Sequence, residues 1–244
     1  DIRGIVVPFK KVTDRLDEGF AEGGQVGAAH RGVLAVDERE ILLAVMGAVG
    51  EGHLDILALD AQRAIAVGAY GLSVTTSDAG KTWTRRKISD ADYHFNRLSR
   101  GPTGTLYLAG EHGTLLRSAD DGATWKNIPA AYEGSFYGIL PLDKRTLIAH
   151  GLRGRSFRSI ADGDTWVPLA TPEPVLLAAS VQLKSNVVIL AGHARVLLVS
   201  RDNGKSLQTW AAPLTTAVAE LIAAPDGSIV ALGEAGATRL AAPR

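Results

Sequence analysis

The sequence contains no cysteine, and its 26 basic residues are matched by 26 acidic ones. The absence of cysteine excludes disulfides, zinc–thiolate sites and cysteine nucleophiles. A formal net charge of zero argues against a nucleic-acid partner, because such binders gain affinity from excess positive charge that displaces counterions from phosphates. The longest apolar run, residues 41–50, is well short of the ~20 residues needed to span a bilayer, so we interpret it as buried core.

Metal and cofactor chemistry also lack a sequence signal. The six histidines show no metal-binding spacing and no HExxH motif, so we predict no metal site. The Gly-x-x-Gly pairs described below are not phosphate loops, because neither a helix nor a Lys-Ser/Thr pair follows them. We therefore predict no cofactor. The first residue is Asp1 rather than Met, for which a removed signal peptide is one explanation and a truncated sequence another.

An internal repeat is the strongest feature that the sequence does have. A polar turn ending on a large apolar residue recurs as TSDAGKTW (76–83), SADDGATW (118–125), SIADGDTW (159–166) and, more weakly, SRDNGKSL (200–207). The last residues of these boxes are 42, 41 and 41 positions apart. Gly-x-x-Gly pairs recur with the same stride between residues 68 and 236, although Arg195 replaces the second glycine of the fourth pair. Two features that keep one period indicate a repeated structural unit.

Each repeat contains short apolar runs separated by Gly, Pro and Asp, which is typical of hairpins. Four strands in about 41 residues is the size of a propeller blade, so we predict an all-β fold: a single β-propeller domain over residues 1–244. The predicted blades are six four-stranded sheets, at about 5–52, 53–93, 94–134, 135–174, 175–216 and 217–244. The last repeat shows only three strands, and we expect an N-terminal strand near residues 2–8 to complete it, because an open ring leaves unpaired edges. Seven blades are possible if residues before Asp1 have been removed.

The boxes are best explained by architecture. Ser, Thr and Asp side chains bond nearby backbone N–H groups, glycine adopts a left-handed conformation at no cost, and the Trp can pack between neighbouring sheets. We therefore assign a structural role, rather than a catalytic one, to Asp78, Gly80, Trp83, Asp120, Gly122, Trp125, Gly163, Trp166, Asp202 and Gly204.

The pattern S-x-D-x-G-x-T-W resembles the Asp box of bacterial neuraminidase repeat (BNR) proteins. Together with AVGAYG (66–71), YLAGEHGTLLRSADDGATW (107–125), YEGSFYG (132–138) and GLRGRSFRS (151–159), it makes residues 53–240 similar to the photosystem II stability/assembly factor-like family. The resemblance implies a non-catalytic propeller that is periplasmic or otherwise exported and binds another protein. Its partner would be a membrane complex or transporter, which it assists as an assembly or accessory factor without spanning the membrane itself.

In such a propeller, the turns between second and third strands share one face with the blade-to-blade loops. Loops on a rigid scaffold are the usual place for binding residues. The candidates on this rim are Tyr70, His94, Arg97, Glu111, His112, Tyr132, Glu133, Arg153, His193 and Glu234. Arg97 and Arg153 are the first candidates for an acidic partner, because arginine is enriched at binding hot spots. A solvated rim without a ligand is the alternative.

A sialidase-like glycoside hydrolase or a carbohydrate-binding propeller is the second functional hypothesis, because BNR boxes also occur in sialidases. Such an enzyme would need a Tyr nucleophile with a Glu partner and an arginine cluster, for which Tyr70, Tyr132, Glu111 and Arg153 are available. The sequence RGIVVPF (3–9) does not match the Arg-Ile-Pro signature of sialidases. Glu111 and Glu234 also lie three blades apart, further than the roughly 5–9.5 Å that separates paired glycosidase carboxylates.

Overall fold

The computed structural model describes residues 53–243, which form five antiparallel sheets. The first sheet contains β1 (His53–Ala58), β2 (Ala64–Gly68), β3 (Ser73–Thr76) and β4 (Thr84–Arg85). The second contains β5 (Phe95–Arg100), β6 (Leu106–Gly110), β7 (Leu115–Ser118) and β8 (Lys126–Asn127). The third contains β9 (Phe136–Pro141), β10 (Leu147–Gly151), β11 (Ser156–Ser159) and β12 (Val167–Pro168). The fourth contains β13 (Leu177–Gln182), β14 (Val188–Gly192), β15 (Leu197–Ser200) and β16 (Gln208–Thr209), and the fifth contains β17 (Val218–Ala223), β18 (Ile229–Gly233) and β19 (Gly236–Leu240).

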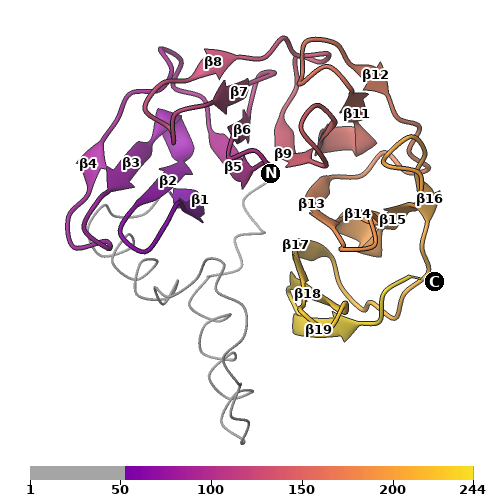
Figure 1. Cartoon of the computed structure of the whole chain (residues 1–244). Coiled ribbons are helices and arrows are strands. Elements are labelled where there is room, and N and C mark those ends of the chain that lie inside the picture. The colour runs from indigo at the N-terminus through magenta and orange to yellow at the C-terminus, as the bar shows by residue number, and fades with distance from the viewer. Residues whose placement is uncertain (1–52, 244) are drawn as a thin grey trace, which may run out of the picture.

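The sheets are arranged as the blades of a propeller. Figure 1 shows them following one another in an arc, with the first strand of each sheet at the centre and the short fourth strands on the outside. Each first strand packs against the first strand of the next sheet. Within the described part of the chain, no helix is long and apolar enough to cross a membrane. The all-β propeller predicted from the repeat is therefore confirmed.

The number of sheets differs from the prediction. Five sheets are described, rather than six or seven, and the fifth has three strands instead of four. The expected blade at residues 5–52 and the expected closing strand near residues 2–8 lie outside the described residues.

Apolar side chains fill the spaces between neighbouring sheets. The second strand of each of the first four sheets is buried at every position, because the sheets cover it on both faces. Between the second and third sheets, for example, Leu115 and Ile128 pack with Phe136 and Leu147. This packing explains why these strands are continuous apolar runs rather than alternating ones.

In the second to fifth sheets, a close approach of two backbones requires glycine at the end of the second strand. A β-bulge interrupts the pairing between first and second strands here, and it brings the chain before the first strand onto the glycine. An added Cβ on Gly151 would overlap the carbonyl oxygen of Ser135 and lie 2.9 Å from the Cα of Phe136. An added Cβ on Gly110 would lie 2.5 Å from the carbonyl oxygen of His94.

Hydrogen bonds within the boxes fix the turns between third and fourth strands. In the second sheet, the Ser118 hydroxyl donates to Asp120 (2.7 Å) and accepts from the N–H of Gly122 (2.8 Å). Thr124 donates to the Asp120 carboxylate through its hydroxyl (2.6 Å) and its N–H (2.9 Å), and these bonds lower the pKa of Asp120 to about 2. The Trp125 indole donates to the carbonyl of Gly122 (3.1 Å). The Asp120 carboxylate is therefore fully used in holding the turn.

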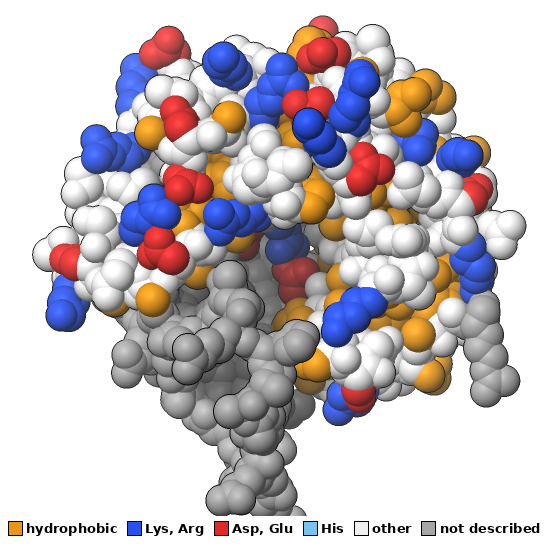
Figure 2. Space-filling model, viewed as in Figure 1, with side chains coloured by type: hydrophobic (Ala, Val, Ile, Leu, Met, Phe, Trp, Pro, Cys, Tyr) orange, Lys and Arg blue, Asp and Glu red, His pale blue; other side chains and the backbone are white. Residues whose placement is uncertain are grey.

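The third and fourth boxes are also bonded to the sheet before them. Arg117 on β7 donates to the Asp162 carboxylate of the third sheet (2.7 Å), and the Tyr107 hydroxyl on β6 donates to its other oxygen (2.6 Å). Arg158, one repeat later, donates to the carbonyl of Asn203 (2.9 Å). These bonds lie on the face seen in Figure 2, where basic and acidic side chains are interspersed.

Candidate functional site

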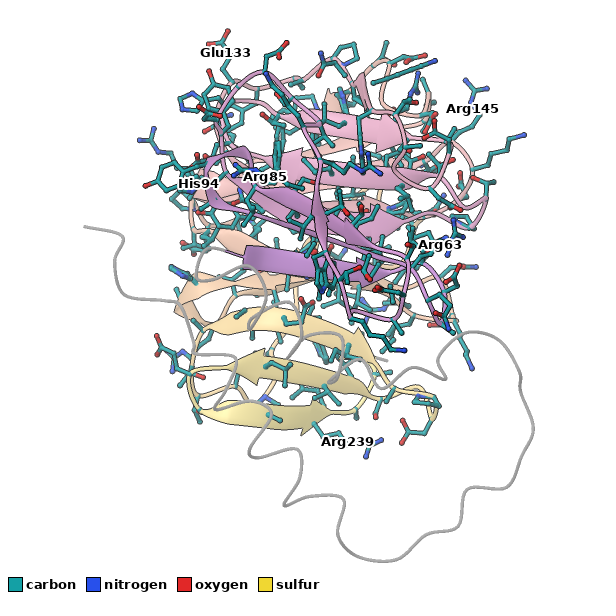
Figure 3. All side chains as sticks on the ribbon, turned by 90° about the vertical axis from the view of Figure 1, so that its left-hand side faces the viewer. Arg63, Arg85, His94, Glu133, Arg145 and Arg239 are labelled. Carbon is teal, nitrogen blue, oxygen red and sulfur yellow. The ribbon has the colours of Figure 1, made fainter. Side chains whose placement is uncertain are left out.

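The turns between second and third strands meet the blade-to-blade loops on the opposite face. The N–H of Gly71 donates to the carbonyl of Tyr93 (2.9 Å), and the N–H of Gly113 donates to that of Gly134 (2.9 Å). Figure 3 shows His94 and Glu133 at one end of the molecule and Arg63 and Arg145 at the other. We call the face that carries His94 and Glu133 the turn face.

Residues at the tips of these turns adopt an unusual backbone conformation. Leu72 N–H donates to the carbonyl of Ala69 (3.0 Å) across a two-residue turn in which Tyr70 has φ 53° and Gly71 has φ 67°. His112, Arg153 and Ala194 occupy the equivalent position, with φ of 51°, 56° and 51°. A left-handed conformation costs a non-glycine residue about 1 kcal/mol, so the surrounding bonds must hold it. The result is a side chain directed away from the sheet, and Tyr70 is 72% exposed.

Aromatic and imidazole rings cluster where the first two sheets meet on the turn face. Tyr70 and His94 form an edge-to-face pair (centroids 4.8 Å apart), and Tyr93 stacks on His112 (4.3 Å). The Glu111 carboxylate accepts the main-chain N–H of His94 (3.1 Å) and lies 3.7 Å from its Nδ1. The side chains predicted for this part of the rim are therefore held together in one cluster.

Basic side chains surround a recess on the third sheet. The recess has a volume of about 400 Å³. It is lined by Arg153, Arg155, Ser156, Phe157, Leu169, Thr171 and Pro174, with Gly154 and Pro168. The Arg155 guanidinium lies 5.7 Å from the centre of the Tyr132 ring, and the buried Ser156 hydroxyl has no hydrogen-bond partner within the described residues. The two guanidinium groups at this recess form a site that suits a carboxylate.

The structure places Arg97 elsewhere than the sequence suggested. Arg97 belongs to β5 at the centre of the arc, not to a blade-to-blade loop, and its guanidinium donates to Glu220 on β17. Asp55 on β1 accepts the N–H of Leu98 (2.7 Å) beside them. We call Asp55, Arg97 and Glu220 the central cluster; Figure 2 shows acidic and basic side chains in the hollow at the centre. Arg97 ties the second sheet to the fifth and is not available to a partner on the turn face.

The central cluster holds two carboxylates and one guanidinium. Burial raises the pKa of Asp55 to about 6, although the charge of Arg97 opposes this shift. Burial alone would lower the pKa of Arg97, but Asp55 and Glu220 hold it above its ordinary value. Sequence reasoning missed Asp55 and Glu220. The repeat relates these positions to Arg97. The third residues of the five first strands keep its stride, and they are residues 55, 97, 138, 179 and 220.

The remaining rim candidates lie apart from one another. His193 is in the turn after β14, where its N–H donates to the carbonyl of Leu176 (3.0 Å), and Glu234 is exposed between β18 and β19. Tyr132 packs against Phe157 (6.2 Å between centroids). Among residues 53–243 no tyrosine–glutamate hydrogen bond links the residues proposed for a sialidase-like site, and no three acidic or histidine side chains are placed to hold a metal ion.

A comparison with protein families gives a match over residues 44–169, just over half of the chain, to the photosynthesis system II assembly factor YCF48. The chain belongs to the YCF48 family. The resemblance suggested by the boxes and glycine pairs is thereby confirmed. A search of curated proteins gives no match.

Solved structures of YCF48 share the fold of this family member. The structure described as YCF48 bound to D1 peptide superposes with a TM-score of 0.59 at 20% identity, over 75% of this chain and 60% of that one. YCF48 from Cyanidioschyzon merolae gives a TM-score of 0.59 at 16% identity, over 79% and 68%. The chain thus spans about 60% of the first of these YCF48 chains. A streptogramin B lyase superposes equally well (TM-score 0.62, 14% identity, 79% and 70% covered), so similarity at this level shows the fold alone.

Proposed function

We propose that this protein is a non-catalytic propeller that binds an extended segment of a partner protein on its turn face. The partner belongs to a membrane complex or transporter, which the propeller serves as an assembly or accessory factor. The observation that carries the proposal is the recess at Arg153 and Arg155, which offers two guanidinium groups and an apolar lining. The peptide bound by one YCF48 structure supports a peptide as the ligand class. The family resemblance supports export from the cytoplasm, which fractionation of cells that express the protein would test.

Arg153→Glu together with Arg155→Glu is expected to weaken binding of an acidic peptide at least tenfold. Charge-assisted hydrogen bonds contribute about 1.5–3 kcal/mol each, and the double reversal replaces attraction with repulsion. The measurement is fluorescence anisotropy with a labelled peptide of ten residues that contains two glutamates and a free C-terminal carboxylate.

Lys144→Glu together with Arg145→Glu is the matched control, because both residues are exposed and Arg145 lies at the opposite end of the molecule (Figure 3). This pair makes the same change in net charge and should leave the affinity unchanged. Equal binding by wild type and the double variant would refute the assignment of the recess. A pull-down from native membranes with the same three proteins then tests whether the physiological partner uses this site.

We also propose that residues 1–52 complete the propeller with a sixth sheet and a closing strand. Among the strands of residues 53–243, β19 pairs only with β18. A recess of about 410 Å³ lies along it, lined by Trp210, Ala211, Ala212, Pro213, Arg239, Leu240 and Ala241–Pro243. The side chain of Ile222 on β17 is 48% exposed, which is unusual in a propeller strand at the centre. One repeat of 41 residues and one further strand fit within the 52 residues before β1.

Cysteine cross-linking tests this closure cleanly, because the chain has no cysteine of its own. Thr238→Cys is paired in turn with cysteine at residues 4, 5 and 6, and we expect one pair to form a disulfide under mild oxidation, since cross-strand neighbours lie within bonding distance. Thr75→Cys with Thr84→Cys, neighbours on β3 and β4, is the positive control. A disulfide in the control but in none of the three test pairs would contradict the closing strand.

A further inference from the structure

A second group on the turn face has a different chemistry from the arginine recess. It contains Tyr70, Asp92, Tyr93, Glu111, His112 and Glu133, which we call the tyrosine–carboxylate patch. The patch lies over the first and second sheets, in two turns and the loops that follow β4 and β8. Its acidic members lie close to the turn tips: a Cβ on Gly71 would be 3.7 Å from Asp92 Oδ1, and one on Gly113 would be 3.5 Å from the Cα of Glu133.

The rings of the patch are fixed before any partner arrives. Tyr70 rests on the edge of His94, Tyr93 stacks on His112, and main-chain bonds join the turns to the loops. Tyr70 is 72% exposed and Tyr93 is 38% exposed, so both rings present area to solvent. A preformed aromatic surface binds with little loss of side-chain entropy.

A cation–π contact nearby shows that a tyrosine ring on this face packs against a guanidinium group. Tyr132 lies in the loop after β8, and the guanidinium of Arg155, just before β11, lies 5.7 Å from the centre of its ring. No described cation covers Tyr70 or Tyr93 in this way. The nearby Lys87 is engaged with Asp90 (2.8 Å). The patch thus combines open aromatic faces with three carboxylates, whereas the arginine recess is positive.

We propose that the tyrosine–carboxylate patch binds a lysine or arginine side chain of the same partner segment whose acidic part occupies the arginine recess. The inference rests on the proposed function and adds the chemistry and direction of the ligand. A cation between a tyrosine face and carboxylates gains both cation–π and ionic attraction. Opposite charges at two places on one face also fix the direction in which the segment lies.

The test compares two labelled ten-residue peptides with blocked ends, one with two arginines and one with citrulline at both positions. Citrulline keeps the shape of arginine and removes its charge. Wild type is expected to bind the arginine peptide about three- to tenfold more tightly in low salt. Tyr70→Leu and the pair Asp92→Lys/Glu133→Lys should abolish this preference, and Tyr70→Phe should retain most of it because the ring remains.

The pair Asp143→Lys/Asp164→Lys is the charge-matched control, since Asp143 is exposed two residues before Arg145 on the opposite face and Asp164 is 66% exposed. It should keep the preference for arginine. Equal affinity of wild type for both peptides, or a preference that survives Tyr70→Leu, would overturn the proposal. The acidic-peptide experiment with Arg153 and Arg155 does not involve these residues, so a failure there would be separate from a failure here.

Discussion

Arg97→Met is expected to lower the free energy of unfolding by about 2–4 kcal/mol at pH 8, an effect far larger than that of an exposed arginine. Removing one partner of a buried ion pair leaves the other charge without compensation. Here two carboxylates, Asp55 and Glu220, would remain at the centre of the arc with no cation from Arg97. The expected loss is smaller than for a fully buried ion pair because the side chains of Arg97 and Glu220 are 24% and 32% exposed. Urea denaturation measures the loss.

The loss should depend on pH. The pKa of Asp55 is raised to about 6 in the folded protein, above its ordinary value of 3.8, so the folded state holds this proton more tightly. Its contribution to stability is therefore greatest below pH 4 and declines as the pH rises through 6. Without Arg97, no guanidinium compensates the negative charges of Asp55 and Glu220 once both are ionised. The variant should therefore lose more stability at pH 8 than at pH 5.

Two further variants separate this explanation from a general packing defect. Adding Asp55→Asn to Arg97→Met removes one of the opposed charges and should recover part of the stability at pH 8, with little effect at pH 5. Arg86→Met, at an exposed position after β4, should change stability by less than about 0.5 kcal/mol. A loss that is equal at both pH values and insensitive to Asp55→Asn would show that packing, rather than charge, explains the role of Arg97.

Gly151→Ala is expected to cost about 3 kcal/mol or to prevent folding. The φ of Gly151 is −177°, outside the left-handed region, so we expect the close approach of the neighbouring backbone to dominate the cost. The new methyl group would overlap the Ser135 carbonyl, and backbone held in a bulge cannot move aside as a flexible side chain can. Thermal and urea unfolding measure the effect.

Gly227→Ala provides the contrast. Gly227 has φ 86° and no atom within 4 Å of an added Cβ, so alanine there meets conformational strain without a clash. We expect a cost of about 1 kcal/mol. If both substitutions cost the same, the close approach of backbones at Gly151 is not what requires glycine at the start of each turn.

The repeat stride predicted the fold because each sheet needs the same three local features. The box forms the turn between third and fourth strands, a glycine leaves room for the neighbouring backbone, and an apolar second strand fills the space between sheets. These requirements are local in sequence, so they can be recognised without coordinates. The conformation of Tyr70 was less accessible, because nothing in Gly-x-x-Gly distinguishes which middle residue takes a positive φ.

The sequence predicted Arg97 on the rim, as part of a blade-to-blade loop. The structure shows why this failed: β5 begins at Phe95, and the bulge turns the third residue of the strand toward the centre. The positive charge is tolerated there because two carboxylates face it. Asp55 lies more than 40 residues before Arg97 in the sequence, and Glu220 lies more than 120 residues after it. Such pairing is invisible in a single repeat and appears only when the repeats are aligned and their third strand residues compared.

The bonds between the third box and the preceding sheet run in both directions. Arg117 and Tyr107 of the second sheet donate to Asp162, whereas the Trp166 indole of the box donates to the carbonyl of Pro129, after β8 (2.8 Å). This junction therefore combines an ion pair with a bond between two neutral groups. High ionic strength should weaken the first and leave the second intact, so added salt should loosen the contact between these two sheets only in part.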